Sequence, residues 1–327
     1  MTRNLLAVHA HPDDESLTMA GTLASAVASG AHVTLVTATL GEQGEVIGDE
    51  LAGLVADRAD QLGGYRYTEL RSACAALGVT DHRMLCGLGT FRDSGMAGTP
   101  SAAHPRAFVR AAAGGPDHHR AVAALVEVIE ETRPLVLLTY DTDGGYGHPD
   151  HIAAHQVALA AVAAATWRVP RTLAVVRPAA AFTAALAALV IPAPYRRVPA
   201  ADLGSLIDDG AVAVAVPVTK WAAQRRGALA AHATQVMLFG GTDFGSTGAT
   251  GFALSNGFGQ PLSDTEYFRV LAGDPVPSGP SGEPASDVFA GLAGLAGLAG
   301  LAGLAESFTG VAGASAGSSV GSSVESS

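Results

Sequence analysis

A short apolar run near the N-terminus ends in a dense group of histidines and carboxylates. Leu5 to Val8 have the character of a buried β-strand, and residues 9–15 then read HAHPDDE. A second apolar run, Pro134 to Tyr140, is followed by YGHPDH at residues 146–151. Open α/β sheets bind their ligands beyond the carboxyl ends of the strands. Two strand ends that each carry His and Asp predict a mononuclear metal site.

The segments around the first group predict a parallel α/β fold. Residues 5–9 predict a strand, residues 16–29 have helix composition with Gly30 as a C-cap, and residues 32–39 are rich in β-branched side chains. The order strand, helix, strand is typical of a parallel βαβ unit. Further helices are predicted at 67–77, 120–132, 150–166, 178–194 and 221–235, and further strands at 83–86, 134–140, 172–176 and 211–216.

The composition changes near residue 275. Ser, Gly and Pro become dominant, and residues 291–305 are five copies of Gly-Leu-Ala. Glycine at every third position without proline does not predict a collagen helix, and glycine disfavours an α-helix. We therefore expect three parts: residues 1–170 with both motifs, 171–274 completing the substrate pocket, and 275–327 as a disordered tail without a catalytic role.

Charge and hydropathy exclude several kinds of partner. The formal net charge of −11 among 327 residues argues against a general nucleic-acid binder. The N-terminus lacks the apolar region of a signal peptide, and the Ala-rich stretch 178–194 is too short for a membrane span. We expect a cytoplasmic protein with no nucleic-acid, membrane or obligate protein partner.

Three side chains of the two motifs have the spacing that a hydrolytic metal requires. Such a metal needs three protein ligands and an open position for water. His11 and Asp14 lie three residues apart at a strand-to-helix turn, and His151 can complete the set. Two imidazoles and one carboxylate suit Zn²⁺ and also Fe²⁺. His155, four residues after His151 on the same helical face, is a rival ligand.

Neighbouring polar side chains can supply the remaining functions of a hydrolase. Asp13 adjoins a ligand and is free to act as general base. His148 can act as general acid or polarise a carbonyl, and Tyr146 can donate to an oxyanion. Asp150 can orient an imidazole. The plain alternative is that Asp13, Asp14 and Asp150 are ordinary acids at the starts of helices.

Two other functions share parts of the pattern. A non-haem Fe²⁺ oxygenase also uses two histidines and a carboxylate, but with other spacing, and it would need oxygen and a 2-oxo acid. A non-catalytic Rossmann module requires Gly-x-Gly-x-x-Gly after its first strand, where this chain has HPDD. Both fit less well than a metal-dependent hydrolase.

The two motifs together resemble the LmbE-like, or PIG-L, zinc deacetylases over about residues 4–272. Members of that family remove acetyl groups from N-acetylglucosaminyl conjugates. The resemblance implies a Rossmann-like α/β fold, with a mostly parallel sheet flanked by helices and a smaller C-terminal part. It also implies one divalent metal, Zn²⁺ before Fe²⁺, with His11, Asp14 and His151 as ligands.

Longer stretches resemble the subgroup of this family that acts in actinobacterial mycothiol biosynthesis. They are residues 40–49 (LGEQGEVIGD), 59–66, 92–99 and 230–236. The subgroup implies hydrolysis of the acetamide of N-acetylglucosaminyl-inositol, a small-molecule substrate, to the free amine and acetate.

The resemblance assigns roles residue by residue. Asp13 matches the general base, His148 the acid or electrostatic stabiliser, and Tyr146 a mobile tyrosine beside the oxyanion. Arg66 and Asp93 match positions that hold the hydroxyls of the sugar-inositol, and guanidinium and carboxylate groups are good partners for polyols.

A sister subgroup is the main alternative. The mycothiol S-conjugate amidases cleave a cysteinyl amide on the same sugar and carry a lysine in the loop after the first motif. Residues 15–19 here read ESLTM and contain no lysine, which favours the deacetylase. Another N-acyl sugar deacetylase of the family is a further alternative.

Overall fold

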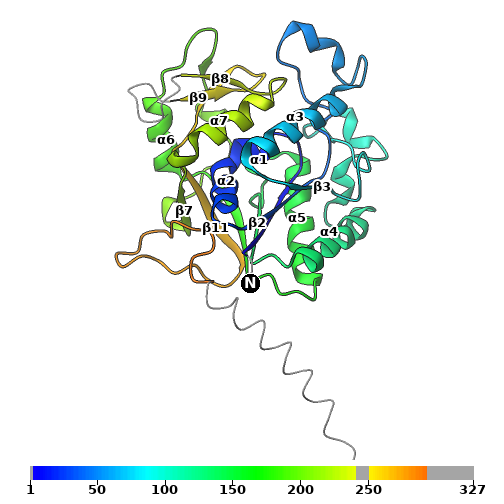
Figure 1. Ribbon diagram of the computed structural model, residues 1–327. Coiled ribbons are helices and arrows are strands. Elements are labelled where there is room, and N and C mark those ends of the chain that lie inside the picture. Colours follow the sequence, from blue (N-terminus) through cyan, green and yellow to red (C-terminus); the bar gives the residue numbers. More distant parts are fainter. Residues whose placement is uncertain (1–2, 241–249, 293–327) are drawn as a thin grey trace, which may run out of the picture. The chain divides into compact units, whose positions relative to one another are not determined.

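A seven-stranded sheet forms the centre of the structure, a computed structural model that describes residues 3–240 and 250–292 (Figure 1). Its strand order is β3-β2-β1-β4-β5-β11-β7. The first five strands are parallel, and β11 runs antiparallel to both of its neighbours. The strands are β1 (Asn4–His9), β2 (His32–Thr37), β3 (Asp81–Met84), β4 (Val136–Thr139), β5 (Arg171–Val176), β7 (Val214–Pro217) and β11 (Thr265–Gly273). The expectation of a mostly parallel α/β sheet is confirmed.

Apolar side chains on both faces explain the position of β1 in the middle of the sheet. Leu5, Leu6, Ala7 and Val8 are all buried, as expected for a parallel strand covered on both sides. β1 pairs with β2 from His32 onward and with β4 from Val136 onward.

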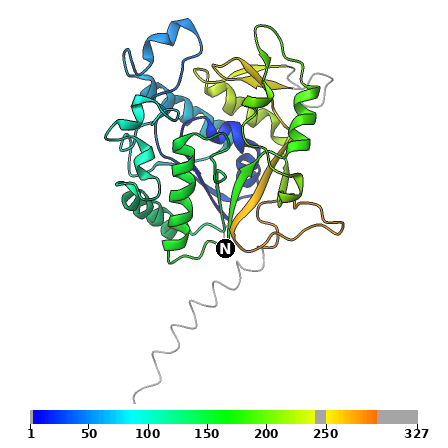
Figure 2. The ribbon, with the colours of Figure 1, turned by 180° about the vertical axis from the view of Figure 1, so that it is seen from behind.

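Helices cover both faces of the sheet (Figures 1 and 2). On one face α2 (Ala20–Ala28), α3 (Leu62–Leu77) and α7 (Ala222–Ala231) contact one another. On the other, α4 (His118–Thr132) packs against α5 (Pro149–Ala164). Among the described residues, no helix is both long and apolar enough to cross a bilayer.

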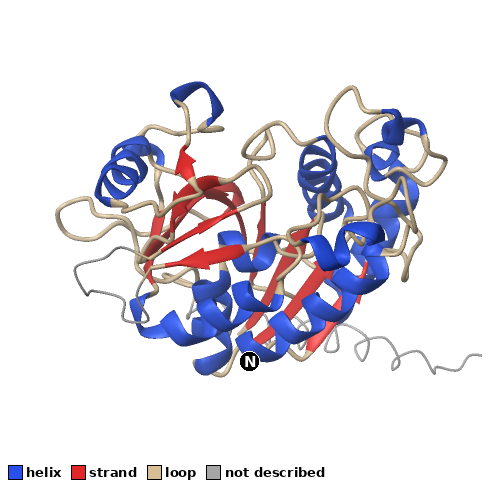
Figure 3. Cartoon of the chain, turned by 90° about the horizontal axis from the view of Figure 1, so that it is seen from above, coloured by secondary structure: helices blue, strands red, loops and turns tan. Residues whose placement is uncertain are grey.

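A smaller sheet lies beside the carboxyl ends of the main strands (Figure 3). Its order is β6 (Arg196–Arg197), β10 (Phe258–Pro261), β9 (Gly251–Ala253) and β8 (Met237–Phe239). α6 (Ala179–Ala188) contacts β10. Residues 171–274 therefore contribute this small sheet and also β5, β7 and β11 of the main one.

Several predicted elements differ in detail. The helix expected at 16–29 is two helices, α1 (Asp14–Thr18) and α2, separated at Met19, whose φ is −146°. The helix expected at 221–235 ends at Ala231, because the next residues form a turn whose side chains bind other parts of the chain. Strands β6 and β8 to β11 were not predicted. Short 3-10 helices lie at Asp49–Leu54, Pro100–Ala103, Phe108–Ala111, Ala200–Asp202, Asp209–Ala211 and Thr219–Trp221.

The tail predicted to be disordered lies mostly outside the described residues, which end at Leu292. Its first residues, up to Ala290, form one unit with the two sheets. Within that unit Val288 and Phe289 are buried, and Arg171 donates hydrogen bonds to the carbonyls of Val288 and Ala290.

Candidate active site

The two sequence motifs meet where the direction of the main sheet reverses. From β1 the chain proceeds to β2 on one side, while β4 leads to β5 on the other. Such a switch point leaves a crevice at the carboxyl ends of the strands. His11 and Asp14 follow β1, and His148 and His151 follow β4, so the topology brings them together.

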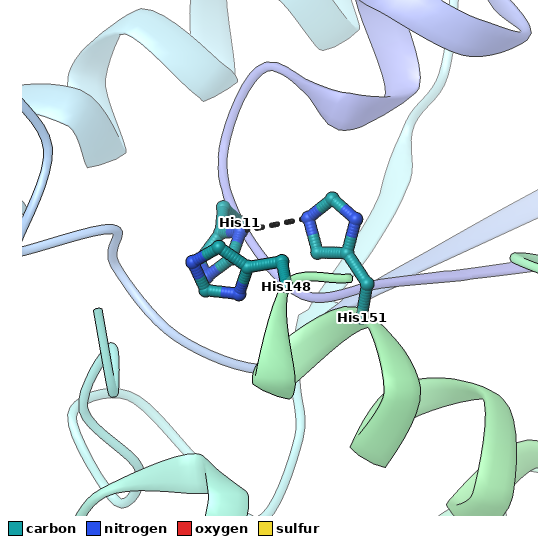
Figure 4. Close-up of side chains that lie close together, drawn as sticks. All are labelled: His11, His148 and His151. Carbon is teal, nitrogen blue, oxygen red and sulfur yellow. Dashed lines mark hydrogen bonds between the residues drawn. The ribbon is translucent and has the colours of Figure 1, made fainter. Parts of the chain in front are cut away.

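The three predicted ligands lie at distances that suit one metal ion. His11 Nδ1 is 3.2 Å from His151 Nε2 and 3.5 Å from Asp14 Oδ2, and His151 Nε2 is 3.4 Å from Asp14 Oδ1. Ligand atoms about 2.0–2.1 Å from a tetrahedral zinc lie roughly 3.3 Å apart. The imidazoles of His11, His148 and His151 face one another in Figure 4. By the spacing of their ligand atoms, these three histidines could hold a metal ion, and so could His11, Asp93 and Asp150.

One ring nitrogen of each predicted histidine ligand lies close to an oxygen acceptor. His11 Nε2 is 3.3 Å from Asp150 Oδ2, and His151 Nδ1 is 3.0 Å from the Gly144 carbonyl oxygen. Metal-binding imidazoles commonly donate their second N–H to such groups. His11 Nδ1 and His151 Nε2 then lie 3.2 Å apart. Burial lowers the pKa of His11, but Asp93, Asp14 and Asp150 outweigh it and raise that pKa well above its usual value, so the carboxylates favour positive charge at this point. The residues present therefore fit a divalent ion.

The Asp14 carboxylate is fixed by a residue that the sequence analysis missed. Tyr140 donates its hydroxyl to Asp14 Oδ2 at 2.6 Å, and its ring stacks on His151 with centroids 4.1 Å apart. Burial and the Asp14 charge hold the pKa of Tyr140 well above its usual value, so the phenol keeps its proton. Its place at the end of the second apolar run was the only sequence signal.

Asp13 lies beside the cluster in a constrained conformation. Its φ of 108° is in the left-handed region, which residues with a Cβ rarely adopt. Its Oδ2 is 3.2 Å from Arg66 Nη2. Burial raises the pKa of Asp13 to about 7, although the Arg66 charge opposes the rise. A carboxyl group that titrates near neutral pH is suited to accept and return a proton.

Arg66 and Asp93 both line the cavity described below, and both also bind the surrounding loops. Arg66 is buried and donates to the carbonyls of Gly41, at 2.7 Å, and Pro12. Asp93 accepts from the backbone N–H of Gly95 at 2.8 Å. Their predicted contacts with substrate hydroxyls stay predictions.

His148 and Tyr146 stand on the β4 side of the site. His148 Nδ1 accepts from the Asp150 backbone N–H at 3.2 Å, so a neutral ring carries its proton on Nε2. Burial, together with the charges of His11 and His151, lowers the pKa of His148 to about 3. Near pH 7 His148 is thus a neutral hydrogen-bond donor. The Tyr146 ring lies edge-on to His151, 5.0 Å between centroids, and the residue is 51% exposed.

Two other histidines have structural contacts. The rival ligand His155 binds the Tyr140 carbonyl through Nδ1 at 2.9 Å. His9 is fully buried in β1 and packs edge-on against the Tyr140 ring.

A cavity of about 610 Å³ opens over these groups, a size typical of small-molecule sites. Its lining includes the polar side chains of His11, Asp13, Asp14, Arg66, Asp93, Tyr146, His148 and His151. Apolar side chains also line it, among them Phe182, Leu203, Phe252 and Phe258. The cavity has room for a disaccharide-sized molecule beside the predicted metal ligands.

Comparisons with known proteins find similarity to deacetylases. A family model described as "PIG-L: GlcNAc-PI de-N-acetylase" matches residues 6–162. A 1D-myo-inositol 2-acetamido-2-deoxy-alpha-D-glucopyranoside deacetylase of Nakamurella multipartita is 66% identical over 88% of this chain and 96% of its own. The protein of that name from Mycolicibacterium vanbaalenii is 49% identical over 83% of this chain and 92% of its own. Among solved structures, a zinc-inhibited teicoplanin deacetylase is 20% identical, covering 70% of this chain and 84% of its own, with a TM-score of 0.44.

Fold and site together define an amide hydrolase whose buried His and Asp cluster can hold a metal ion. The chain belongs to the PIG-L family of de-N-acetylases, as the family match and the extent of identity to its relatives establish.

Proposed function

We propose that the protein hydrolyses the acetamide of N-acetylglucosaminyl-inositol to glucosaminyl-inositol and acetate, a step of mycothiol biosynthesis. One observation carries the proposal: Asp13 and the His11, Asp14 and His151 cluster line one cavity, in a chain 66% identical to a deacetylase named for that substrate. The size of the cavity suits a sugar joined to an inositol.

His11, Asp14 and His151 would hold one divalent ion, zinc in preference to iron(II). When bound, the ion supplies a Lewis acid that polarises the acetamide carbonyl and makes a water more acidic. Asp150 orients His11 through Nε2, and the Gly144 carbonyl orients His151 through Nδ1. These contacts would leave His11 Nδ1 and His151 Nε2 to bind the ion.

Asp13 moves the proton in both halves of the reaction. It accepts a proton from the attacking water as the water oxygen bonds to the carbonyl carbon. It then returns this proton to the nitrogen as the C–N bond breaks, which releases acetate and the amine. The raised pKa of Asp13, about 7, supports this double role.

His148 and Tyr146 stabilise the negative charge on the former carbonyl oxygen. His148 donates from Nε2, and Tyr146 donates its hydroxyl from the cavity rim. Arg66 and Asp93, which line the cavity, bind hydroxyls of the sugar-inositol.

A paired turnover assay tests the proposal. Zinc-loaded protein receives synthetic N-acetylglucosaminyl-inositol or a mycothiol S-conjugate, and acetate and free amine are quantified for each. We expect faster amine release from the first substrate, with one acetate per amine. Faster release from the S-conjugate would overturn the substrate assignment, and the Asp13→Ala variant controls for contaminating hydrolases.

A further inference from the structure

A buried acid–histidine pair lies behind the proposed general base. Glu15 is in α1, and His232 immediately follows α7, 217 residues later. Both side chains are fully buried, and His232 Nε2 is 2.7 Å from Glu15 Oε1. Neither residue lines the cavity, so neither can touch the substrate directly.

The contacts of Glu15 define the direction of each hydrogen bond. Its Oε2 accepts from the Asp13 backbone N–H at 3.1 Å, and its Oε1 accepts from the Ser16 hydroxyl at 2.5 Å. A carboxylate that receives these donors is an acceptor only. His232 must therefore donate from Nε2, and it orients the carboxylate that holds the Asp13 backbone.

Asp13 needs such a support because its backbone is in the left-handed region. A Cβ disfavours that conformation, which persists only where surrounding contacts impose it. Glu15 accepts from the N–H of Asp13, and the carbonyl of Asp13 accepts from the backbone N–H of Ser16 at 3.0 Å and of Leu17 at 2.9 Å. Arg66 reaches the side chain at 3.2 Å. Loss of the Glu15 contact would free the backbone end of this residue.

The turn that carries His232 has a second, independent anchor. Thr234 donates its backbone N–H to Glu69 Oε1 and its hydroxyl to Glu69 Oε2, both at 2.8 Å. Glu69 is in α3 and, in the described contacts, does not bind Asp13. The turn thus makes two separate contacts. His232 binds Glu15, which leads to Asp13, whereas Thr234 binds Glu69 and ties the turn to α3.

We propose that Glu15 and His232 are positioning residues for Asp13: His232 orients the Glu15 carboxylate, which fixes the Asp13 backbone and aims its side chain at the reacting water. This inference rests on the proposed function, because it takes Asp13 as the general base. The exact placement of Asp13 matters because displacing a catalytic group by about 1 Å can cost roughly 100-fold in rate.

The decisive comparison is His232→Leu against His232→Gln in the full-length, zinc-loaded protein. Leucine removes the donor to Glu15, whereas a glutamine amide can place an N–H near the position of Nε2. We expect kcat to fall about 10- to 100-fold in His232→Leu, with KM and bound zinc within about twofold of wild type. His232→Gln should recover most of the loss. Glu15→Leu, which removes the acceptor itself, should reproduce the kcat loss.

Thr234→Val is the matched control, because it removes a buried hydroxyl from the same turn and leaves Glu15 untouched. It should lower the melting temperature without lowering kcat. The proposal is overturned if His232→Leu retains the kcat of Thr234→Val, if His232→Gln recovers nothing, or if lost zinc accounts for lost activity. These comparisons are made on whichever amide the wild type hydrolyses. A wild type that hydrolyses no amide overturns the proposed function, whereas an active wild type with unimpaired variants overturns this inference alone.

Discussion

The loop after β1 and the loop after β4 meet at one site, but different kinds of contact hold them. Around Asp13, side chains from distant segments bind the chain: Arg66 from α3, Glu15 with its partner His232, and Tyr140 through Asp14. The β4 loop is also bound by distant residues, since Arg177 donates to the Gly145 carbonyl and Ser205 to the Asp143 carboxylate. It differs in containing Gly144, Gly145 and Gly147, all with positive φ, and in the 51% exposure of Tyr146.

This contrast matches the catalytic roles proposed for the two loops. The β1 loop carries two ligands and a proton acceptor, whose separations must be kept to a fraction of an ångström. The β4 loop carries Tyr146, whose partner is a charge that exists only during the reaction. Buried side-chain contacts around Asp13 suit the first task, and the exposed position of Tyr146 among glycines suits the second.

The largest effects should come from the β1 loop and should separate into two kinds. His11→Ala should lose both zinc and turnover, because it removes a ligand. Asp13→Ala should keep zinc while kcat falls about 10²- to 10⁴-fold, the usual contribution of acid–base catalysis. Metal analysis beside steady-state kinetics distinguishes them. Retained turnover in Asp13→Ala would remove Asp13 from its role.

On the β4 side, Tyr146→Phe should lower kcat about 100-fold, the lower range for losing one oxyanion donor. Zinc content and melting temperature should stay near wild type, since the residue is half exposed. An effect on KM alone would instead make Tyr146 a substrate-binding group.

Two glycine substitutions compare the support of Asp13 with the β4 loop. Gly41 follows β2 and contacts Arg66, the partner of Asp13, whereas Gly147 lies in the β4 loop. Gly41 and Gly147 both have positive φ, so alanine costs each about 1–2 kcal/mol of backbone strain. A Cβ at Gly41 would lie 2.1 Å from Arg66 Nη1, whereas one at Gly147 meets nothing within 4 Å. Gly41→Ala should therefore also lower kcat, by about tenfold, through displacement of Arg66 from Asp13. Equal kcat in the two variants would contradict the contrast between the support of Asp13 and the β4 loop.

The smallest effect concerns pH and stability. Burial lowers the pKa of His232, but the Glu15 charge and hydrogen bond outweigh it and raise the pKa above its usual 6.5. Asp13 also raises it, and Arg66 opposes the rise. A histidine whose pKa is raised in the folded state contributes its full stability below pH 6.5. That contribution is lost as pH rises through the pKa of the folded state.

The melting temperature of the wild type should therefore fall more between pH 6 and pH 9 than that of His232→Gln. A difference of about 1 kcal/mol would appear as roughly 2 °C at this chain length. Thermal unfolding across that range measures it, and parallel curves would show that the pair contributes no pH-dependent stability.

Local sequence was sufficient for the fold class and for the grouping of the predicted ligands. Leu5 to Val8 predict a buried strand because apolar side chains on both faces suit only a covered parallel sheet. His11 and Asp14 share a turn by their spacing alone. The parallel order of strands then brings them to His151 at one sheet edge.

The chain pattern did not predict the partners that hold these groups. Tyr140 is bound to Asp14 across 126 residues, and His232 to Glu15 across 217. No periodicity encodes such pairs, because they depend on how α7 packs against α1 and on the register of β4 beside β1.

Local patterning thus places the reactive side chains at the ends of two strands, because strand and turn propensities act over a few residues. Their orientation, their burial and the resulting pKa of Asp13 arise from segments far apart in the chain. Those properties depend on desolvation and on hydrogen bonds that exist only after the helices have packed.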